Sequence, residues 1–349
     1  MKTKVVWMDE EHMDMQVLAE AGRLIQQGEL VAFPTETVYG LGGDALQEDS
    51  SRKIYAAKNR PCDNPLIIHI AKWEDIYRIC REIPKAAEKL ADAFWPGPLT
   101  MILKKQDIVP KETTGGLDTV AVRLPGHAVA RAFIEAAGGF VAAPSANVSG
   151  RPSPTLAKYV LEDMDGKIPL IIDGGAVGIG VESTIIDLTE GTPMILRPGY
   201  ITQEMLSEVL GDVSEDRTLM KPAKDVAPKA PGMKYRHYAP KGNLVIVDGP
   251  EDQVITYINA ACKKALAEGK RTGVLCTRET ELRYEADRVK CVGTRADEST
   301  VAHGLYQALR ECDEEGLEVL FAESFSTEGI GQAIMNRLLK AAGYQVIRL

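Results

Sequence analysis

The residues of this 349-residue chain that could do chemistry gather in five short segments, each next to an apolar run. The segments are 33–43, 57–66, 142–150, 172–184 and 196–199. They carry hydroxyl, amide and cationic side chains, which bind phosphate or carboxylate oxygens. No Ser-His-Asp or Cys-His arrangement can be inferred among them. The residue types therefore favour positioning and charge neutralisation of an anionic substrate over covalent catalysis.

Lys58 and Arg60 supply two of these charges. They lie where a short helix is expected to break into a loop bounded by Pro61 and Pro65. In such a loop, the compact lysine charge and the bidentate arginine fork can converge on one anion. A solvated surface pair is the alternative, and the Lys-x-Arg spacing alone does not decide between the two.

Other polar side chains follow the ends of predicted strands. Thr35 follows one such strand, and Ser145 and Asn147 follow another. The carboxyl ends of strands are where α/β sheets bind ligands, although ordinary turns use the same residue types. The glycines form neither a G-x-G-x-x-G nor a Walker motif, so a nucleotide would not be held in a P-loop. His69 lies inside an apolar strand, where a hydrogen-bonded core histidine is the more frequent explanation.

The elements that must position these residues alternate between helix and strand over the first two hundred residues. Helical spacing of apolar residues predicts helices at 13–25, 85–94 and 128–137. Apolar runs predict strands at 30–33, 66–70, 99–103, 119–124, 140–143, 170–172 and 184–188. Some of these strands are joined by connections too short for a crossover helix. We therefore expect one large α/β domain with a mixed sheet, residues 1–210.

A second domain is expected after a stretch without periodicity. Residues 211–241 contain four prolines and no helical or strand period, which indicates a linker. Beyond it, apolar patterns predict strands at 244–247, 273–276, 318–322 and 345–348, and helices at 253–267, 301–311 and 330–342. This pattern is typical of a smaller, Rossmann-like α/β domain, residues 242–349.

Composition and charge exclude several classes of protein. Hydrophobic residues make up 45% and charged residues 26%, which is ordinary for a globular protein and unlike a disordered chain. The net charge of −9 disfavours a protein that binds nucleic acid through its overall charge. The six cysteines form no Cys-x-x-Cys pair, which argues against a zinc or redox motif. The lack of a long apolar run and of a signal-peptide pattern predicts a cytoplasmic location.

Taken in order, the motifs resemble those of the L-threonylcarbamoyladenylate synthases. Motifs of the YrdC-like domain of that family are matched by residues 34–42, 58–60, 95–100, 144–147 and 181–185 of this chain. Residues 230–240 and 329–337 resemble the long form of the family, which carries a C-terminal domain. The resemblance covers nearly the whole chain. Each motif alone is a weak signal, but the ordered set is specific.

The resemblance implies a nucleotidyltransferase that makes L-threonylcarbamoyl-AMP and pyrophosphate from L-threonine, bicarbonate and ATP. It also implies a role in tRNA processing, because the product supplies the threonylcarbamoyl group of the adenosine next to the anticodon in tRNAs that read ANN codons. A partner transferase complex would receive the product transiently. Mg²⁺ would be bound mainly through the ATP phosphates, without a metal motif in the protein. No membrane partner is implied, and direct tRNA binding is compatible with this function but not required.

The resemblance further implies roles for individual residues. The cations that match catalytic positions are Lys58 and Arg60. The positions that match ATP-binding residues are Lys58, Arg60, Thr119, Ser145, Asn147, Arg197 and Tyr235. The positions that match threonine-binding residues are Thr35, His69, Arg123 and Ser183. Tyr235 lies in the linker, which we expect to fold over the site as a lid that excludes water from labile intermediates.

Two other functions share features with this sequence. A non-catalytic module that binds tRNA or double-stranded RNA is the alternative, since YrdC-like domains have a concave basic face. The acidic balance of this chain disfavours it. A related carbamoyl-transfer enzyme is also disfavoured, because such relatives carry zinc fingers and this chain has no Cys-x-x-Cys pair to form them.

Overall fold

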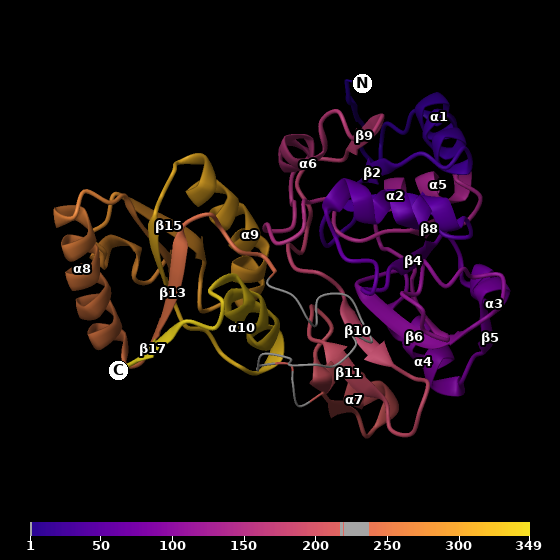
Figure 1. Ribbon diagram of the computed structural model, residues 1–349. Coiled ribbons are helices and arrows are strands. Elements are labelled where there is room, and N and C mark those ends of the chain that lie inside the picture. Colours follow the sequence, from indigo (N-terminus) through magenta and orange to yellow (C-terminus); the bar gives the residue numbers. More distant parts are fainter. Residues whose placement is uncertain (1, 217–218, 220–236) are drawn as a thin grey trace. The chain divides into compact units, whose positions relative to one another are not determined.

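The computed structural model describes residues 2–216, 219 and 237–349 (Figure 1). These residues divide into two compact units. The first contains residues 2–149, 153–178, 182–216 and 219, and the second contains residues 150–152, 179–181 and 237–349. The expected lid over most of the linker, with Tyr235, lies outside the described residues. Among the helices of the described residues, none has the length and apolar character needed to cross a membrane.

The first unit contains a mixed sheet, as the sequence predicts, but the sheet has twelve strands rather than the seven expected. Eleven of its strands follow the order β1-β9-β2-β3-β8-β4-β7-β6-β10-β11-β12, and β5 pairs with β6 beside this path. The strands are β1 (Lys4–Trp7), β2 (Val31–Phe33), β3 (Gly40–Asp44), β4 (Ile67–Ile70), β5 (Cys80–Glu82), β6 (Leu99–Lys105), β7 (Thr119–Arg123), β8 (Phe140–Ala142), β9 (Leu170–Asp173), β10 (Thr184–Asp187), β11 (Met194–Arg197) and β12 (Ser214–Glu215). Parallel pairs such as β4 and β7 alternate with antiparallel pairs such as β4 and β8.

Helices cover this sheet and bury two apolar cores. They are α1 (Met15–Gln26), α2 (Glu48–Lys58), α3 (Ile76–Ile79), α4 (Lys85–Phe94), α5 (Ala128–Ala136), α6 (Ala157–Met164) and α7 (Gln203–Leu210). One core joins α1 and α5 to the sheet through residues such as Leu18 and Phe133. The other lies under α2, α4, α6 and α7. Asp14 caps α1 by accepting hydrogen bonds from the backbone N–H groups of Gln16 and Val17, which fixes where that helix begins.

The first unit departs from the sequence analysis in two details. The glycine-rich residues 40–44, for which the sequence predicts no strand, form strand β3. Glycine is required there because a Cβ atom on Gly42 would lie 2.8 Å from Val141 Cγ1. The sheet also continues beyond the predicted domain boundary at residue 210, because β12 pairs in parallel with β11.

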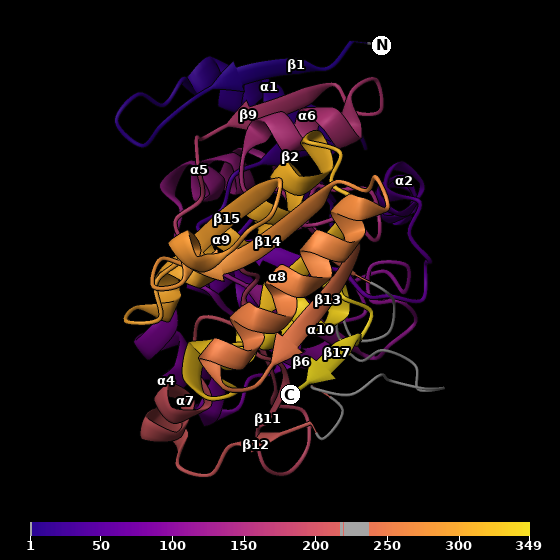
Figure 2. The same cartoon turned by 90° about the vertical axis from the view of Figure 1, so that its left-hand side faces the viewer.

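The second unit is a five-stranded parallel sheet in the order β15-β14-β16-β13-β17. Its strands are β13 (Asn243–Asp248), β14 (Thr272–Thr277), β15 (Arg288–Gly293), β16 (Val319–Glu323) and β17 (Val346–Arg348), and its helices are α8 (Glu251–Ala267), α9 (Glu298–Glu314) and α10 (Gly329–Ala341). Figure 2 shows α8 lying across one face of this sheet, and Figure 1 shows α9 and α10 on the other. Parallel strands covered by helices on both faces confirm the Rossmann-like prediction. All six cysteines, each within the described residues, are free thiols.

Candidate functional site

Lys58 is the last residue of α2, and its ammonium group is buried. The helix ends because Asn59 adopts the left-handed conformation (φ 51°, ψ 45°). Only 2% of the Lys58 surface is exposed. Its Nζ donates hydrogen bonds to the backbone carbonyl oxygens of Ser145 and, at 2.5 Å, of Asn147. The solvated surface alternative is therefore wrong for Lys58.

Ser145 and Asn147 lie in the segment that follows β8. Ser145 Oγ donates a hydrogen bond to Asn147 Oδ1 at 2.5 Å, and Asn147 Nδ2 donates to the carbonyl oxygen of Val148 at 2.9 Å. A short bridge pairs Ser145 with Gly40 of β3. The structure thus brings Lys58, Ser145 and Asn147 into one group, which we call the Lys58 group.

Arg60 lies just beyond α2, in the proline-bounded loop. Its side chain is half-buried, and Nη2 donates to the carbonyl oxygens of Asn64, at 3.2 Å, and Pro65, at 3.0 Å. These bonds hold the guanidinium group against its own loop. The backbone of Arg60 also bonds to Tyr55, in the last turns of α2. Arg60 is therefore fixed to the same helix end as Lys58.

A second group forms where β2 ends. Thr35 Oγ1 donates to the carbonyl oxygen of Val38 at 2.7 Å and lies 2.9 Å from Thr37 Oγ1. It also accepts hydrogen bonds from the N–H groups of Thr37 and Val38, at 3.2 and 3.3 Å. A threonine hydroxyl that bonds the following backbone stabilises a tight turn. The Thr35 hydroxyl thus shapes the segment that carries Glu36 and Thr37.

Arg123, the last residue of β7, is held by that segment. Its Nη1 donates to Thr37 Oγ1 at 3.0 Å, and its Nη2 forms an ion pair with Glu36 Oε1 at 2.7 Å. Burial is the largest single influence on Glu36 and would raise its pKa. The Arg123 charge and the hydrogen bonds to the carboxylate together outweigh burial and lower that pKa below its usual range. Sequence reasoning missed Glu36 and Thr37 as partners of Arg123. A lone carboxylate inside a threonine-rich motif was the available signal.

His69 lies opposite Arg123 in the register of the neighbouring strands β4 and β7. Its Nδ1 is 3.2 Å from the carbonyl oxygen of Ile67, and its ring meets the edge of Phe33 with centroids 6.0 Å apart. Burial, together with the positive charge of Arg123, lowers the pKa of His69 to about 3. The imidazole is therefore neutral at physiological pH. The structure brings Thr35, His69 and Arg123 together, and we call these residues with Glu36 and Thr37 the Arg123 group.

Ser183 and Arg197 form a third group of polar contacts, together with Thr100. Arg197 donates from Nη2 to Ser183 Oγ and from Nε to the Ser183 carbonyl oxygen, both at 3.0 Å. Ser183 Oγ also lies 2.7 Å from Thr100 Oγ1. The family resemblance assigns Ser183 to threonine and Arg197 to ATP, yet the two residues are in direct contact. Thr100, which sequence reasoning named only within a motif, is their link to β6.

The segment 97–100 connects these last two groups. Arg123 Nε donates to the carbonyl oxygen of Gly97 at 3.4 Å, and Thr100 contacts Ser183. Thr119 is placed apart from them, because it begins β7 whereas Arg123 ends it. At about 3.3 Å per strand residue, the two are separated by roughly 13 Å. Thr119 is half-buried and pairs with Lys104 of β6.

A cavity of about 780 Å³ is lined by residues that neighbour the Arg123 group in the sequence, such as Leu124, but by none of the candidate residues themselves. Its walls include Trp73, Trp95, Pro96 and Leu124. Trp95 and Pro96 belong to the motif that leads into Gly97, so the cavity and the Arg123 group share one supporting segment.

Known proteins are similar to this chain over its whole length. A family model described as "Telomere recombination" matches residues 23–199, and one described as "Threonylcarbamoyl-AMP synthase, C-terminal domain" matches residues 201–343. The chain is 50% identical to a threonylcarbamoyl-AMP synthase of Pyrococcus abyssi, over 94% of this chain and 95% of that protein. It is 47% identical to a threonylcarbamoyl-AMP synthase of Bacillus subtilis over the full length of both.

A solved structure is also similar over the whole chain. It is the crystal structure of P. abyssi Sua5 in complex with L-threonine, with a TM-score of 0.94 and 48% sequence identity. The similarity covers 99% of this chain and all of that one. Both the fold and the order of the two units are therefore shared with a protein that binds L-threonine.

Proposed function

The chain belongs to the threonylcarbamoyl-AMP synthase family, and on this premise we propose that it makes L-threonylcarbamoyl-AMP and pyrophosphate from L-threonine, bicarbonate and ATP. The observation that carries the proposal is the full-length similarity to the P. abyssi protein with bound L-threonine. The three groups of polar contacts described above give the proposal its residues. No observation favours the alternative of a non-catalytic RNA-binding module.

The proposed reaction has two steps. The amine of threonine adds to bicarbonate with loss of water, which gives a carbamate. A carbamate oxygen then attacks the α-phosphorus of ATP, and the bond to pyrophosphate breaks. For transfer at phosphorus, the protein mainly has to position the reacting groups and place positive charge near the phosphate oxygens.

We assign Lys58, Arg60, Ser145 and Asn147 to the ATP phosphates. The Lys58 ammonium is fixed at the segment 145–147 by its carbonyl contacts, so its charge is placed before substrate arrives. A positioned charge needs no reorganisation during the reaction, which is the basis of electrostatic catalysis. Arg60, held against its loop, would add a planar fork for phosphate oxygens.

We assign Thr35, His69, Arg123 and Ser183 to L-threonine. Arg123 suits the substrate carboxylate because guanidinium binds carboxylates in a bidentate manner. Its ion pair with Glu36 and its bond to Thr37 would orient that fork. The depressed pKa of His69 keeps its ring uncharged, so it can exchange neutral hydrogen bonds with the substrate hydroxyl or amine.

Further parts of the proposal rest on the family resemblance. Thr119, Arg197 and Tyr235 would contact ATP, and the segment around Tyr235 would act as a lid. Mg²⁺ would be held mainly by ATP phosphate oxygens. Among the residues that the structure describes, no group of three or more His, Cys, Asp or Glu side chains could hold a metal ion, so the proposal gives the ion no protein ligand. The product would pass to a transferase complex that modifies tRNA, in the cytoplasm.

Pyrophosphate release tests the proposal. The full chain should release pyrophosphate from ATP only when L-threonine and bicarbonate are both present, and omission of either should stop release. Lys58→Ala should lose this activity, whereas Lys53→Ala, which changes an exposed lysine of the same helix, should keep it. Release that ignores threonine or bicarbonate, or tRNA binding without any release, would contradict the proposal.

A further inference from the structure

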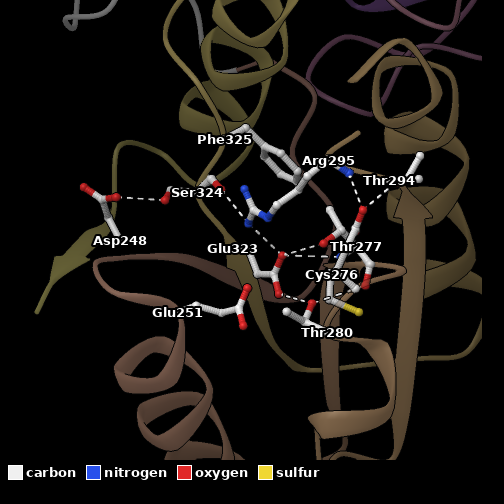
Figure 3. A network of polar contacts seen from close by, with 12 residues as sticks. Asp248, Glu251, Cys276, Thr277, Thr280, Thr294, Arg295, Glu323, Ser324 and Phe325 are labelled. Atoms are coloured by element: carbon white, nitrogen blue, oxygen red, sulfur yellow. Dashed lines mark hydrogen bonds and ion pairs between the residues drawn. The ribbon is translucent and has the colours of Figure 1, made fainter. Parts of the chain in front are cut away.

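The carboxyl edge of the five-stranded sheet in the second unit collects polar residues from four of its strands. Asp248 ends β13, Thr277 ends β14 and Glu323 ends β16, while Arg295 follows the end of β15 (Figure 3). The strands β14 and β16 are neighbours in the sheet. From β14 the chain continues to β15 at one edge of the sheet, and from β16 it continues to β17 at the other edge. Connections that diverge between neighbouring strands open a crevice, and ligands of open α/β sheets bind there.

Glu323 organises this crevice. It is 2% exposed, and its Oε1 accepts a hydrogen bond from Tyr284 at 2.8 Å and one from Thr280. Its Oε2 accepts from the N–H and Oγ1 of Thr277, both at 3.3 Å, and from Arg295 Nη2 at 2.9 Å. Both carboxylate oxygens are thus used within the protein. Glu323 is therefore a positioning residue that holds Tyr284 and Arg295 rather than a ligand contact.

Arg295 is the cation that this arrangement presents. Besides Glu323, its Nη2 donates to the Ser324 carbonyl oxygen at 3.1 Å, and its guanidinium carbon lies 5.2 Å from the centre of the Phe325 ring. Nε and Nη1 have no hydrogen-bond partner among the described residues, and 39% of the side chain is exposed. One nitrogen of the guanidinium fork is anchored, and the others are available to a ligand.

A cavity of about 260 Å³ lies beside Arg295. Val247, Val254 and Tyr284 contribute apolar lining, which we call the apolar floor. The polar residues that line the cavity are Glu251, Arg295, Glu323 and Ser324. The volume is below the ~300–1,000 Å³ typical of sites for drug-sized ligands, so the ligand must be small.

The charges around the cavity select the chemical class. The guanidinium of Arg295 suits a carboxylate. Glu251, more than half exposed in the first turn of α8, pairs through Oε1 with Arg283 at 2.7 Å, which leaves Oε2 for a ligand. Asp248 places a second carboxylate at the same edge, where it accepts a hydrogen bond from the Ser324 hydroxyl and lies 3.9 Å from Arg348 Nε. Two carboxylates disfavour a phosphate ester or another multiply charged anion, but they suit an ammonium group. We propose that this crevice binds a free α-amino acid, with its carboxylate on Arg295, its ammonium near Glu251 and its side chain on the apolar floor.

Binding of free L-amino acids to the full chain, measured by titration calorimetry, tests the proposal. At least one amino acid should bind, and Arg295→Gln should weaken it roughly tenfold or more because the charged fork is lost. Arg295→Lys should also weaken binding, since one ammonium does not replace a bidentate fork. Arg288→Gln, at the other end of β15, should leave binding unchanged.

The result for L-threonine is interpreted separately, because the proposed function already gives this amino acid a site in the first unit. If it is also the ligand of this crevice, the wild-type chain should bind two equivalents and the Arg295→Gln chain one. Pyrophosphate release should persist in that variant, so failure of this inference and failure of the proposed function are distinguishable.

Glu251→Gln keeps the proposal testable if the arginine variants fail to fold, because the side chain of Glu251 is more than half exposed. It should weaken an amino acid but not its 2-hydroxy acid analogue, which lacks the ammonium group. Three results would overturn the proposal: no amino acid binding at millimolar concentration, equal binding of the 2-hydroxy acid, or preferential binding of inorganic phosphate.

Discussion

The buried, neutral His69 makes a quantitative prediction about acid stability. Its pKa is about 3 in the folded chain and about 6.5 when unfolded. Between these two values the unfolded chain binds a proton that the folded chain does not. Stability must therefore rise with pH in this window and be lost as pH falls from about 6.5 toward 3. At about 1.4 kcal/mol per unit, His69 alone should cost on the order of 2 kcal/mol of folding free energy at pH 5.

The change that reveals this contribution is His69→Gln, which keeps a polar side chain but removes the titration. Unfolding by guanidinium chloride would be measured at pH 7.5 and pH 5 for both chains. The three tryptophans, Trp7, Trp73 and Trp95, all lie in the first unit, so their fluorescence follows that unit within the full chain. The wild-type chain should lose about 2 kcal/mol more than the variant on going to pH 5.

The comparison between two pH values cancels the general cost of replacing a core side chain. His12→Gln, which replaces an exposed histidine, controls for the substitution itself. If the His69→Gln and wild-type chains lose the same stability between pH 7.5 and pH 5, His69 is not shielded as described. The assignment of a neutral His69 to the threonine site would then fail with it.

Three further predictions concern the first unit. Lys58→Met should abolish pyrophosphate release and also lower the free energy of unfolding by about 2–4 kcal/mol, because two carbonyl oxygens lose a charged donor. Lys53→Met should lower it by less than about 1 kcal/mol. Equal losses of the two variants in fluorescence-monitored unfolding would refute this. Thr35→Val should raise KM for L-threonine more than KM for ATP, because the hydroxyl shapes the turn that holds Arg123; an equal rise in both would argue against it. Glu36→Gln should likewise raise KM for L-threonine, by weakening the ion pair that orients Arg123; an unchanged KM for threonine would show that Glu36 has no positioning role.

Much of the fold follows from hydrophobic periodicity. The helices of the first unit with strong apolar faces, such as α1 and α5, and the apolar strands β4, β6 and β7 lie where the sequence predicts them. The sequence does not predict the bounds of helix α2, because much of the buried face of this helix is polar. Ser50 and Ser51 are fully buried in it, and Ser51 Oγ lies 2.9 Å from Thr113 Oγ1. A face of small hydroxyls carries no hydrophobic period.

Strand β15 was also missed, and for a related reason. Its charged and apolar residues alternate over only four positions, 288–291, and Lys290 is paired with Glu311 of α9 and with Glu315, which follows α9. Pairing of that kind comes from tertiary structure, so no local pattern reports it. The same applies to β3, whose glycines look like a turn until the neighbouring side chains are placed against them.

The candidate site shows where residue types stop being informative. Sequence motifs name Arg123 and Ser183 as separate positions, sixty residues apart in the chain. Only the fold shows that Gly97 accepts a hydrogen bond from Arg123 while Thr100, three residues on, contacts Ser183. The arginine fork and the Ser183–Arg197 pair are therefore positioned by one short segment. Residues proposed for threonine and for ATP depend on the same backbone, which would keep the carbamate and the α-phosphorus in register.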